Sequence, residues 1–202
     1  MSPSLFIAVL TFSLVSAFTP GPNNLLALAS GANWGYRRTL PHVFGVAVGY
    51  AIMLALMGAG LGSLFKAAPI AQEILKWLAI AYLTFLAWKI ATSTGIDDSS
   101  TSKESKPITF LGSAAFQWIN PKAWIAAITI VTTFTIPHSY WTSLLICGAT
   151  NVGIALCAVS SWALFGTIVK NWLSNPVRLR IFNWSMAALL LVSVLPSVFS
   201  IH

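Results

Sequence analysis

The sequence predicts an all-α protein that crosses a lipid bilayer six times, and three observations support this fold class. Only 7% of the 202 residues are charged, 57% are apolar, and the mean hydropathy is +0.81. A soluble domain keeps about a quarter of its residues charged, because its surface faces water. Six apolar runs are each long enough to cross a hydrocarbon core of ~30 Å, which takes about 20 helical residues. A single polar stretch divides these runs into two sets of three.

The six predicted spans lie near residues 4–30, 40–64, 70–92, 109–136, 140–169 and 178–200. We interpret the chain as one transmembrane domain, 1–202, in which repeat one covers 1–93, a cytoplasmic linker covers 94–107 and repeat two covers 108–202. Because each half holds an odd number of spans, the second half must be inverted relative to the first. Inverted repeats are typical of secondary transporters, which bind substrate where broken helices of the two halves meet.

The basic residues predict the orientation in the membrane. If six spans alternate, eight Lys and Arg residues fall in or beside the loops of one side and two on the other. Cytoplasmic loops collect Lys and Arg, so both termini are expected in the periplasm of a bacterial cytoplasmic (inner) membrane protein. The net charge of +7 does not indicate nucleic-acid binding, since the basic residues form no dense cluster with surface aromatics. The eight are Arg37, Arg38, Lys89, Lys103, Lys106, Lys170, Arg178 and Arg180.

The two cysteines favour neither a metal site nor redox chemistry. Cys147 and Cys157 lie in one apolar run, ten residues apart, without metal-ligand spacing. A membrane oxidoreductase of this size would need paired cysteines on different spans. We therefore expect no cofactor, no metal and no enzymatic activity.

Two proline-containing motifs predict helix breaks at matching positions in the two halves. Span one contains Thr19–Asn24, read Thr-Pro-Gly-Pro-Asn-Asn, and span four contains Gln117–Lys122, read Gln-Trp-Ile-Asn-Pro-Lys. Proline lacks an N–H and clashes with the preceding turn. Thr19 before Pro20, and Asn120 before Pro121, resemble an N-cap followed by proline at the first helical position. A simple kink remains the alternative for each motif alone.

If both helices restart at mid-membrane, two helix N-termini face a shared space. Each carries about half a positive charge and free N–H donors, which suit a carboxylate. Lys122 adds a full charge far from either end of its span, and intramembrane ionisable residues are by default candidates for function. Its alternative role is to donate to the carbonyls that the break frees.

Other polar and small residues allow less specific predictions. Gln117 and Asn151 would either line a cavity or cross-link helices. Gly45 and Gly49, four residues apart in span two, are expected to permit close helix packing. His42 lies near a span end, where we expect a solvated side chain. Glu73 and Lys76 would form an interfacial pair at the outer end of span three.

The chain resembles the LysE/RhtB family of amino-acid exporters. The resemblance rests on Thr19–Asn23, on four glycines (Gly31, Gly35, Gly45 and Gly49), on Ala81–Lys89 and on Asn120–Lys122, and it covers the whole chain. Within the family, the sequence is most similar to the branch that exports cysteine and O-acetylserine. The resemblance implies an exporter that works by alternating access with proton antiport.

Two departures from the family pattern bear on the substrate. Members that export lysine or arginine carry aspartates at the positions that match Tyr50 and Ala126. Without those acids a cationic side chain lacks a partner, so small neutral amino acids are the expected substrates, and the proton-relay residue is left open. A passive channel or scaffold is the alternative, and a homodimer is compatible with the sequence. The expected substrate-binding residues are Thr19, Pro20, Gly21, Pro22, Asn23, Asn24, Tyr50, Gln117, Asn120, Pro121, Lys122 and Asn151.

Overall fold

The structure is a computed structural model that describes residues 1–61, 68–93 and 107–193. Every regular element within these residues is helical, which confirms the all-α class. Nearly all of the predicted linker 94–107 lies outside the described residues. The α-helices are α1 (Pro3–Phe18), α2 (Pro22–Trp34), α3 (Tyr36–Leu56), α5 (Pro69–Ala91), α6 (Phe110–Phe116), α7 (Pro121–Thr133), α8 (Tyr140–Lys170) and α9 (Pro176–Val192). Short 3-10 or π turns are η1 (Met57–Leu61), η2 (Gln117–Ile119), η3 (Pro137–Ser139) and η4 (Trp172–Ser174).

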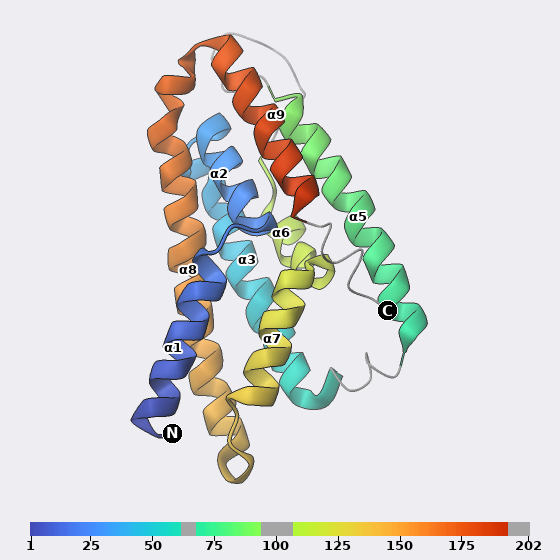
Figure 1. Ribbon diagram of the computed structural model, residues 1–202, viewed down its shortest axis with the longest axis vertical. Coiled ribbons are helices and arrows are strands. Elements are labelled where there is room, and N and C mark those ends of the chain that lie inside the picture. The colour runs from blue at the N-terminus through green and yellow to red at the C-terminus, as the bar shows by residue number, and fades with distance from the viewer. Residues whose placement is uncertain (62–67, 94–106, 194–202) are drawn as a thin grey trace.

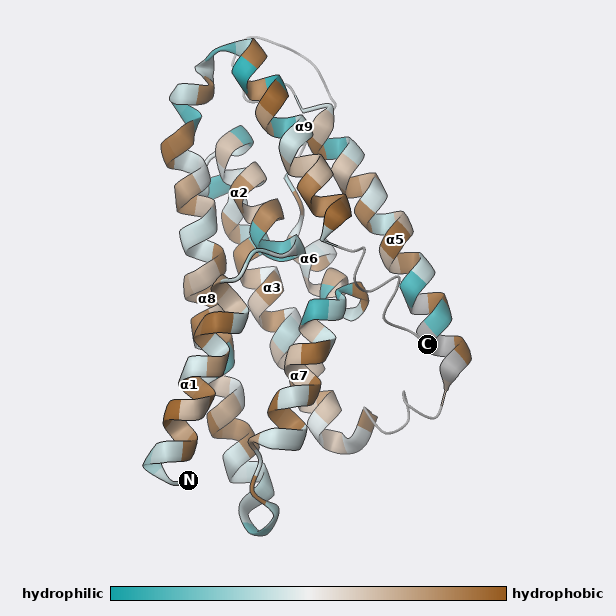
Figure 2. Ribbon diagram, in the orientation of Figure 1, coloured by the Kyte–Doolittle hydropathy of each residue, from teal (hydrophilic) through white to brown (hydrophobic). Residues whose placement is uncertain are grey.

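Long apolar helices support a membrane protein. Within the described residues, the stretches Tyr36–Leu61 and Pro137–Lys170 are long and apolar enough to cross a bilayer, and α1 with α2 would form a third span with a bend of 52°. Large apolar side chains face outward, for example Leu145 and Ile168 of α8, which are 72% and 71% exposed. Figure 2 shows such apolar residues along the outer helices. The count of six spans stays a prediction.

The elements of the two halves follow one another in the same order. A broken pair, α1 and α2, precedes the long helix α3, and the pair α6 and α7, joined through η2, precedes the long helix α8. Both breaks lie near mid-height in Figure 1, where α1 leads upward into α2 and α6 leads downward into α7. The two broken segments therefore meet at the same level of the molecule.

Glycines allow two close helix contacts that position these breaks. A Cβ at Gly45 would lie 2.4 Å from the Phe110 carbonyl oxygen, and one at Gly49 would lie 2.6 Å from the Ala114 Cα, so α3 touches the α6 backbone. A Cβ at Gly31 would lie 2.0 Å from the Ala163 carbonyl oxygen, so the backbones of α2 and α8 also touch. The packing role predicted for Gly45 and Gly49 is confirmed.

A buried polar cluster fastens α2 to α9 and to Ser93, the second residue after α5. The Asn33 and Asn183 amides exchange hydrogen bonds of 2.8 and 3.1 Å. The Ser93 hydroxyl donates to Asn33 Oδ1 at 2.9 Å, and Asn183 Nδ2 donates to the Ser93 carbonyl at 2.8 Å. All three residues are buried, and their polar atoms supply one another with partners, as burial requires.

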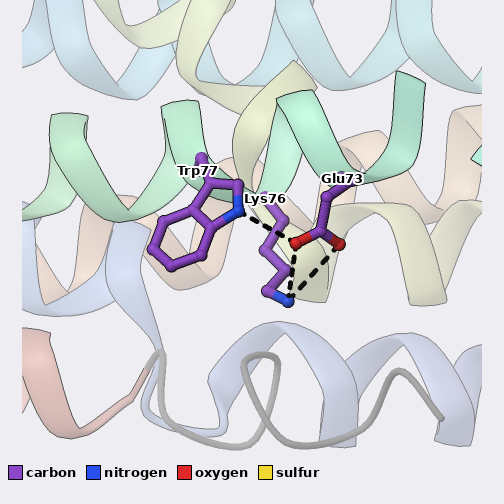
Figure 3. Close-up of polar contacts among 3 residues, drawn as sticks. All are labelled: Glu73, Lys76 and Trp77. Atoms are coloured by element: carbon purple, nitrogen blue, oxygen red, sulfur yellow. Dashed lines mark hydrogen bonds and ion pairs between the residues drawn. The ribbon is translucent and has the colours of Figure 1, made fainter. Parts of the chain in front are cut away.

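Glu73 is the only acidic residue within the described part of the chain. The partners that its carboxylate binds lie on its own helix, α5. Its carboxylate accepts from Lys76 Nζ at 3.2 Å and from Trp77 Nε1 at 2.9 Å, as Figure 3 shows. The predicted Glu73–Lys76 pair is confirmed, and an exposed pair of this kind contributes little to stability.

Candidate functional site

The first helix break extends from Thr19 to Gly21, and it differs in detail from the sequence prediction. Thr19 is not an N-cap: it ends α1, where its N–H and its hydroxyl both donate to the Val15 carbonyl. Helix α2 begins at Pro22, with Gly21 as its N-cap. The prediction failed because two prolines compete for the first helical position, and the second one occupies it. Pro20 lies in the connection between the two helices.

The second break follows the prediction. Asn120 is the N-cap of α7, its side-chain oxygen accepts from the Lys122 N–H at 3.2 Å, and Pro121 stands at the first helical position. The two half-helix N-termini are consequently not equivalent. Asn120 caps α7 with its own side chain, whereas no side-chain hydrogen bond caps α2 at Gly21. Of the two, the α2 N-terminus is the better donor to an external anion.

Lys122 joins the two breaks, which are about a hundred residues apart in sequence. Its Nζ donates to the Thr19 carbonyl at 2.5 Å, so the alternative role in binding a freed carbonyl is observed. The side chain lies over Gly21, where a Cβ would be 2.8 Å from Lys122 Cδ and 3.1 Å from Nζ. An ammonium group has three donors, so this one bond leaves capacity for a ligand.

A cavity of about 70 Å³ lies where the breaks meet. This volume has room for several water molecules or a small polar ligand. Of the predicted site residues, those that line it are Gly21, Asn23, Asn24, Tyr50, Gln117, Asn120, Lys122 and Asn151. The other four, Thr19, Pro20, Pro22 and Pro121, shape the breaks without lining the cavity.

Amide side chains hold the cavity walls together. Asn23 Nδ2 donates to Gln117 Oε1 at 2.9 Å, which links α2 to η2. Asn24 Nδ2 donates to the carbonyls of Ala17 and Thr19 at the end of α1. Asn151 Nδ2 donates to Ser13 Oγ at 2.7 Å, which links α8 to α1. Gln117 and Asn151 thus fulfil both roles that the sequence left open.

Tyr50 contributes the one buried side-chain polar atom without a hydrogen-bond partner in the part of the chain that the structure describes. The side chain is only 5% exposed and lines the cavity. Its neighbours on the wall include the apolar Val46, Ala123 and Ala126. A buried hydroxyl without a partner is costly, and a ligand in the cavity would supply one.

His42 is the residue that sequence reasoning missed. The expectation of a solvated histidine is wrong, because the side chain is 0% exposed. Its Nδ1 lies 2.7 Å from Ser113 Oγ on α6, and its Nε2 lies 3.2 Å from the Asn23 carbonyl oxygen on α2. The helix begins earlier than predicted, at Tyr36, so position 42 lies almost two turns inside it. No local sequence pattern signalled this burial, because it depends on α6 passing close to α3 at Gly45.

Comparison with known proteins identifies the family of the chain. The family model described as "LysE type translocator" matches residues 14–194. The cysteine/O-acetylserine efflux proteins of Escherichia coli (strain K12) and Shigella sonnei (strain Ss046) are each 35% identical over 175 residues, which cover 84% of this chain and 86% of theirs. No solved structure matches the chain. Since the family model spans nearly all of the chain, the protein belongs to the LysE type translocators.

Proposed function

We propose that the protein is a secondary transporter that exports small neutral amino acids across the bacterial cytoplasmic membrane. Cysteine and O-acetylserine are the first candidates, because the relatives in Escherichia coli and Shigella sonnei carry those names. Transport proceeds by alternating access and is coupled to proton antiport. The observation that carries the proposal is the cavity at the meeting point of two helix breaks, which is lined by Lys122 and by several amide side chains.

The cavity offers recognition for both charges of a zwitterion. The Lys122 ammonium and the uncapped α2 N-terminus at Gly21 provide the donors for the substrate carboxylate. Amide oxygens of Asn23 and Gln117, which also line the cavity, can accept from the α-ammonium group. The substrate side chain would then reach the Tyr50 hydroxyl.

The lining also favours substrates without a net positive charge. Tyr50 and Ala126, where the basic-substrate exporters carry aspartates, both lie on the cavity wall. No acidic residue lines the cavity among the described residues. A lysine or arginine side chain would therefore be desolvated beside Lys122 without a counter-charge, which is strongly unfavourable.

The proposed architecture consists of six spans in two inverted repeats, 1–93 and 108–202, with a cytoplasmic linker and periplasmic termini. Two observations support it: the matching order of elements in the two halves, and the opposite directions of the broken pairs in Figure 1. This arrangement puts the substrate at the repeat interface, as in other transporters with inverted repeats. It fits a monomer or a homodimer equally.

Uptake of labelled amino acids by reconstituted vesicles tests the proposal. Vesicles preloaded with unlabelled cysteine should accumulate external labelled cysteine by saturable exchange, whereas labelled lysine should not exchange. The Lys122→Ala variant should lose affinity by roughly thirtyfold or more, because leaving one partner of a buried ion pair alone costs about 2–5 kcal/mol. Apparent KM from the concentration dependence of exchange is the measurement.

Two further variants make this test specific. Gly21→Ala keeps the ammonium but places a Cβ 2.8 Å from Lys122 Cδ, so it should displace the lysine and weaken exchange as well. Lys170→Ala, at the end of α8, removes one positive charge away from the cavity and should exchange normally. Normal exchange by both Lys122→Ala and Gly21→Ala would refute this site. Ohmic conductance without saturable exchange would instead indicate a channel.

A further inference from the structure

His42 is buried between the two half-helices that border the substrate cavity. It belongs to α3, yet its ring bonds Ser113 on α6 through Nδ1 and the Asn23 carbonyl on α2 through Nε2. Neither Ser113 nor His42 lines the cavity, but Asn23 does. The imidazole is therefore separated from the substrate site by one residue, Asn23. The His42 side chain has no accessible surface, with 0% exposure.

The two partners of the ring allow it to hold or release a proton. A carbonyl oxygen only accepts, so Nε2 carries hydrogen in either state of the ring. A serine hydroxyl both donates and accepts. In the neutral ring Ser113 donates to Nδ1, and in the charged ring Nδ1–H donates to Ser113 after the hydroxyl has turned. Both protonation states of the ring therefore keep both hydrogen bonds.

A chain of hydrogen bonds connects this ring to the substrate groups. Asn23, whose carbonyl bonds His42, donates through Nδ2 to Gln117 Oε1 at 2.9 Å. Gln117 Nε2 in turn donates to the Ser113 carbonyl at 2.8 Å. The ring, α2, η2 and α6 thus form one closed network. A charge on the ring acts on the two amides that we assign to the substrate ammonium.

Among the described residues, no acidic residue bonds to this ring or lies on an element packed against α3. Glu73, the single acid of the described residues, is bonded to Lys76 and Trp77 on α5. Of the elements packed against α3, the helices α2 and α6 and the turns η1 and η2 carry no titratable side chain. The titratable residues on the others and on α3 itself are Lys122 of α7; Tyr140, Cys147, Cys157 and Lys170 of α8; and Tyr36, Arg37, Arg38 and Tyr50 of α3.

We propose that His42 is the proton-binding residue that couples export to the proton gradient, with Ser113 as its switching partner. This inference rests on the proposed transport function. A proton that enters from the periplasm forms the Nδ1–H bond of His42, and the same bond breaks when the proton leaves to the cytoplasm. The charged ring and the substrate ammonium would repel each other across Asn23 and Gln117. Proton and amino acid therefore occupy the site in turn, which is the requirement for antiport.

Two uptake modes, measured on the same proteoliposomes, separate coupling from transport. In counterflow, vesicles loaded with unlabelled cysteine exchange it for external labelled cysteine, with the pH equal on both sides and the cysteine kept reduced. This exchange needs no proton step. Uptake into cysteine-free vesicles with an acidic lumen, with the membrane potential clamped, depends on coupling. One pH unit should support about a tenfold accumulation for one proton exchanged per zwitterion, since a factor of ten in proton activity equals a factor of ten in substrate ratio. The wild-type protein should show both modes.

The His42→Gln variant should retain counterflow and lose the gradient-driven accumulation, because glutamine can bond to Ser113 and Asn23 but cannot carry the proton. The matched control is His138→Gln, at an exposed turn, which should accumulate like the wild type. Ser113→Ala keeps the imidazole and removes the group that accepts from its charged form, so accumulation should require a more acidic lumen. This shift would identify the residue even if His42→Gln failed to insert.

The outcomes distinguish the two proposals. Gradient-driven accumulation by His42→Gln at the wild-type level, or an unchanged pH profile in Ser113→Ala, would overturn the role of His42 while leaving the transporter intact. Absence of counterflow in the wild-type protein would instead refute the proposed function.

Discussion

At the residue scale, the Tyr50 hydroxyl defines what the cavity can recognise beyond the zwitterionic groups. It is buried, it lines the cavity, and it has no partner among the described residues. Its side chain packs in an apolar cluster that includes Ala123 and Ala126, which also line the cavity. A substrate side chain that ends in a hydroxyl, thiol or ester oxygen would satisfy this group, whereas a purely aliphatic one would not.

The Tyr50→Phe variant tests this role. Removing the hydroxyl should weaken the exchange of cysteine and O-acetylserine, because a hydrogen bond contributes about 0.5–1.5 kcal/mol net, or roughly twofold to thirteenfold in affinity. Exchange of alanine, which has no polar side-chain atom, should be unaffected or slightly better. The measurement is the ratio of apparent KM values for cysteine and alanine in each protein. An equal change for both substrates would show that Tyr50 only shapes the cavity.

Individual residues differ in how far the sequence predicted them. Asn120 was identifiable as an N-cap, because asparagine is a preferred N-cap residue and proline a preferred first helical residue, although a simple kink was the alternative. Lys122 was identifiable as a candidate from its charge in an apolar run, but the sequence left open whether it binds substrate or the freed carbonyl that it contacts in the structure. His42 was not, since its burial depends on α6 passing close to Gly45, and no local pattern records a contact made 71 residues later in the chain.

At the element scale, the cavity depends on the contact between α3 and α6. Tyr50 and His42 belong to α3, and α6 leads directly into η2, which carries Gln117. Gly45 and Gly49 bring the two backbones together, because any side chain there would meet the α6 main chain. Close approach through small residues is a common means of packing helices in membranes, where the hydrophobic effect does not hold helices together.

The Gly49→Ala variant should therefore destabilise the protein and widen the cavity. A Cβ would lie 2.6 Å from both Cα and the carbonyl oxygen of Ala114, so the backbones must separate, and overpacking of this kind costs typically 1–3 kcal/mol. Gly153→Ala is the matched control, since no atom lies within 4 Å of a Cβ there. That variant should be neutral or slightly stabilising, because alanine is the better helix former.

Thermal unfolding in detergent is the measurement for both glycine variants. A lower Tm for Gly49→Ala together with an unchanged or higher Tm for Gly153→Ala is the expected result. Equal Tm values for Gly49→Ala and the wild type would mean that α3 and α6 are less closely packed than the structure places them.

The order of the elements was largely predictable, and the points at which they begin and end were less so. Proline removes a backbone donor wherever it stands, and this predicted both breaks, although Pro41 lies inside α3 without ending it. The start of α2 does not, because Pro20 and Pro22 are equally suited to a first turn. The boundary between α2 and α3 is set by Gly35 at φ 80°, a conformation that glycine alone adopts easily, and hydropathy does not detect it.

At the scale of the whole molecule, α8 fixes the topology more firmly than any other helix. Its 31 residues extend over roughly 46 Å at 1.5 Å per residue, longer than a hydrocarbon core of ~30 Å. Both of its ends must then emerge from the membrane if it spans. The turn that follows α8 leads to Arg178 and Arg180, whereas η3, which precedes it, has no Lys or Arg. The positive-inside rule puts the Arg-rich end in the cytoplasm.

Labelling of engineered cysteines in intact cells tests this orientation. Ser139 in η3 and Ser174 in η4 flank α8, and both are at least partly accessible. In a background with Cys147→Ala and Cys157→Ala, a membrane-impermeant thiol reagent should label Ser139→Cys from outside. It should label Ser174→Cys only after the cells are permeabilised, as it should Ser100→Cys in the predicted linker, which lies outside the described residues.

The physical reason for this expectation is the distribution of charge. Moving a loop with Arg178 and Arg180 across the membrane during insertion is disfavoured, whereas the turn at Ser139 carries no positive charge to retain it. If α8 runs in this direction, α7 would run outward from the cavity, and Lys122 at its start would lie near mid-membrane. External labelling of Ser174→Cys with protection of Ser139→Cys would show that the protein has the opposite orientation in the membrane. The proton in the His42 proposal would then move in the opposite direction relative to the fold. Equal labelling of both from outside would mean that α8 does not span the membrane, and the six-span topology would be wrong.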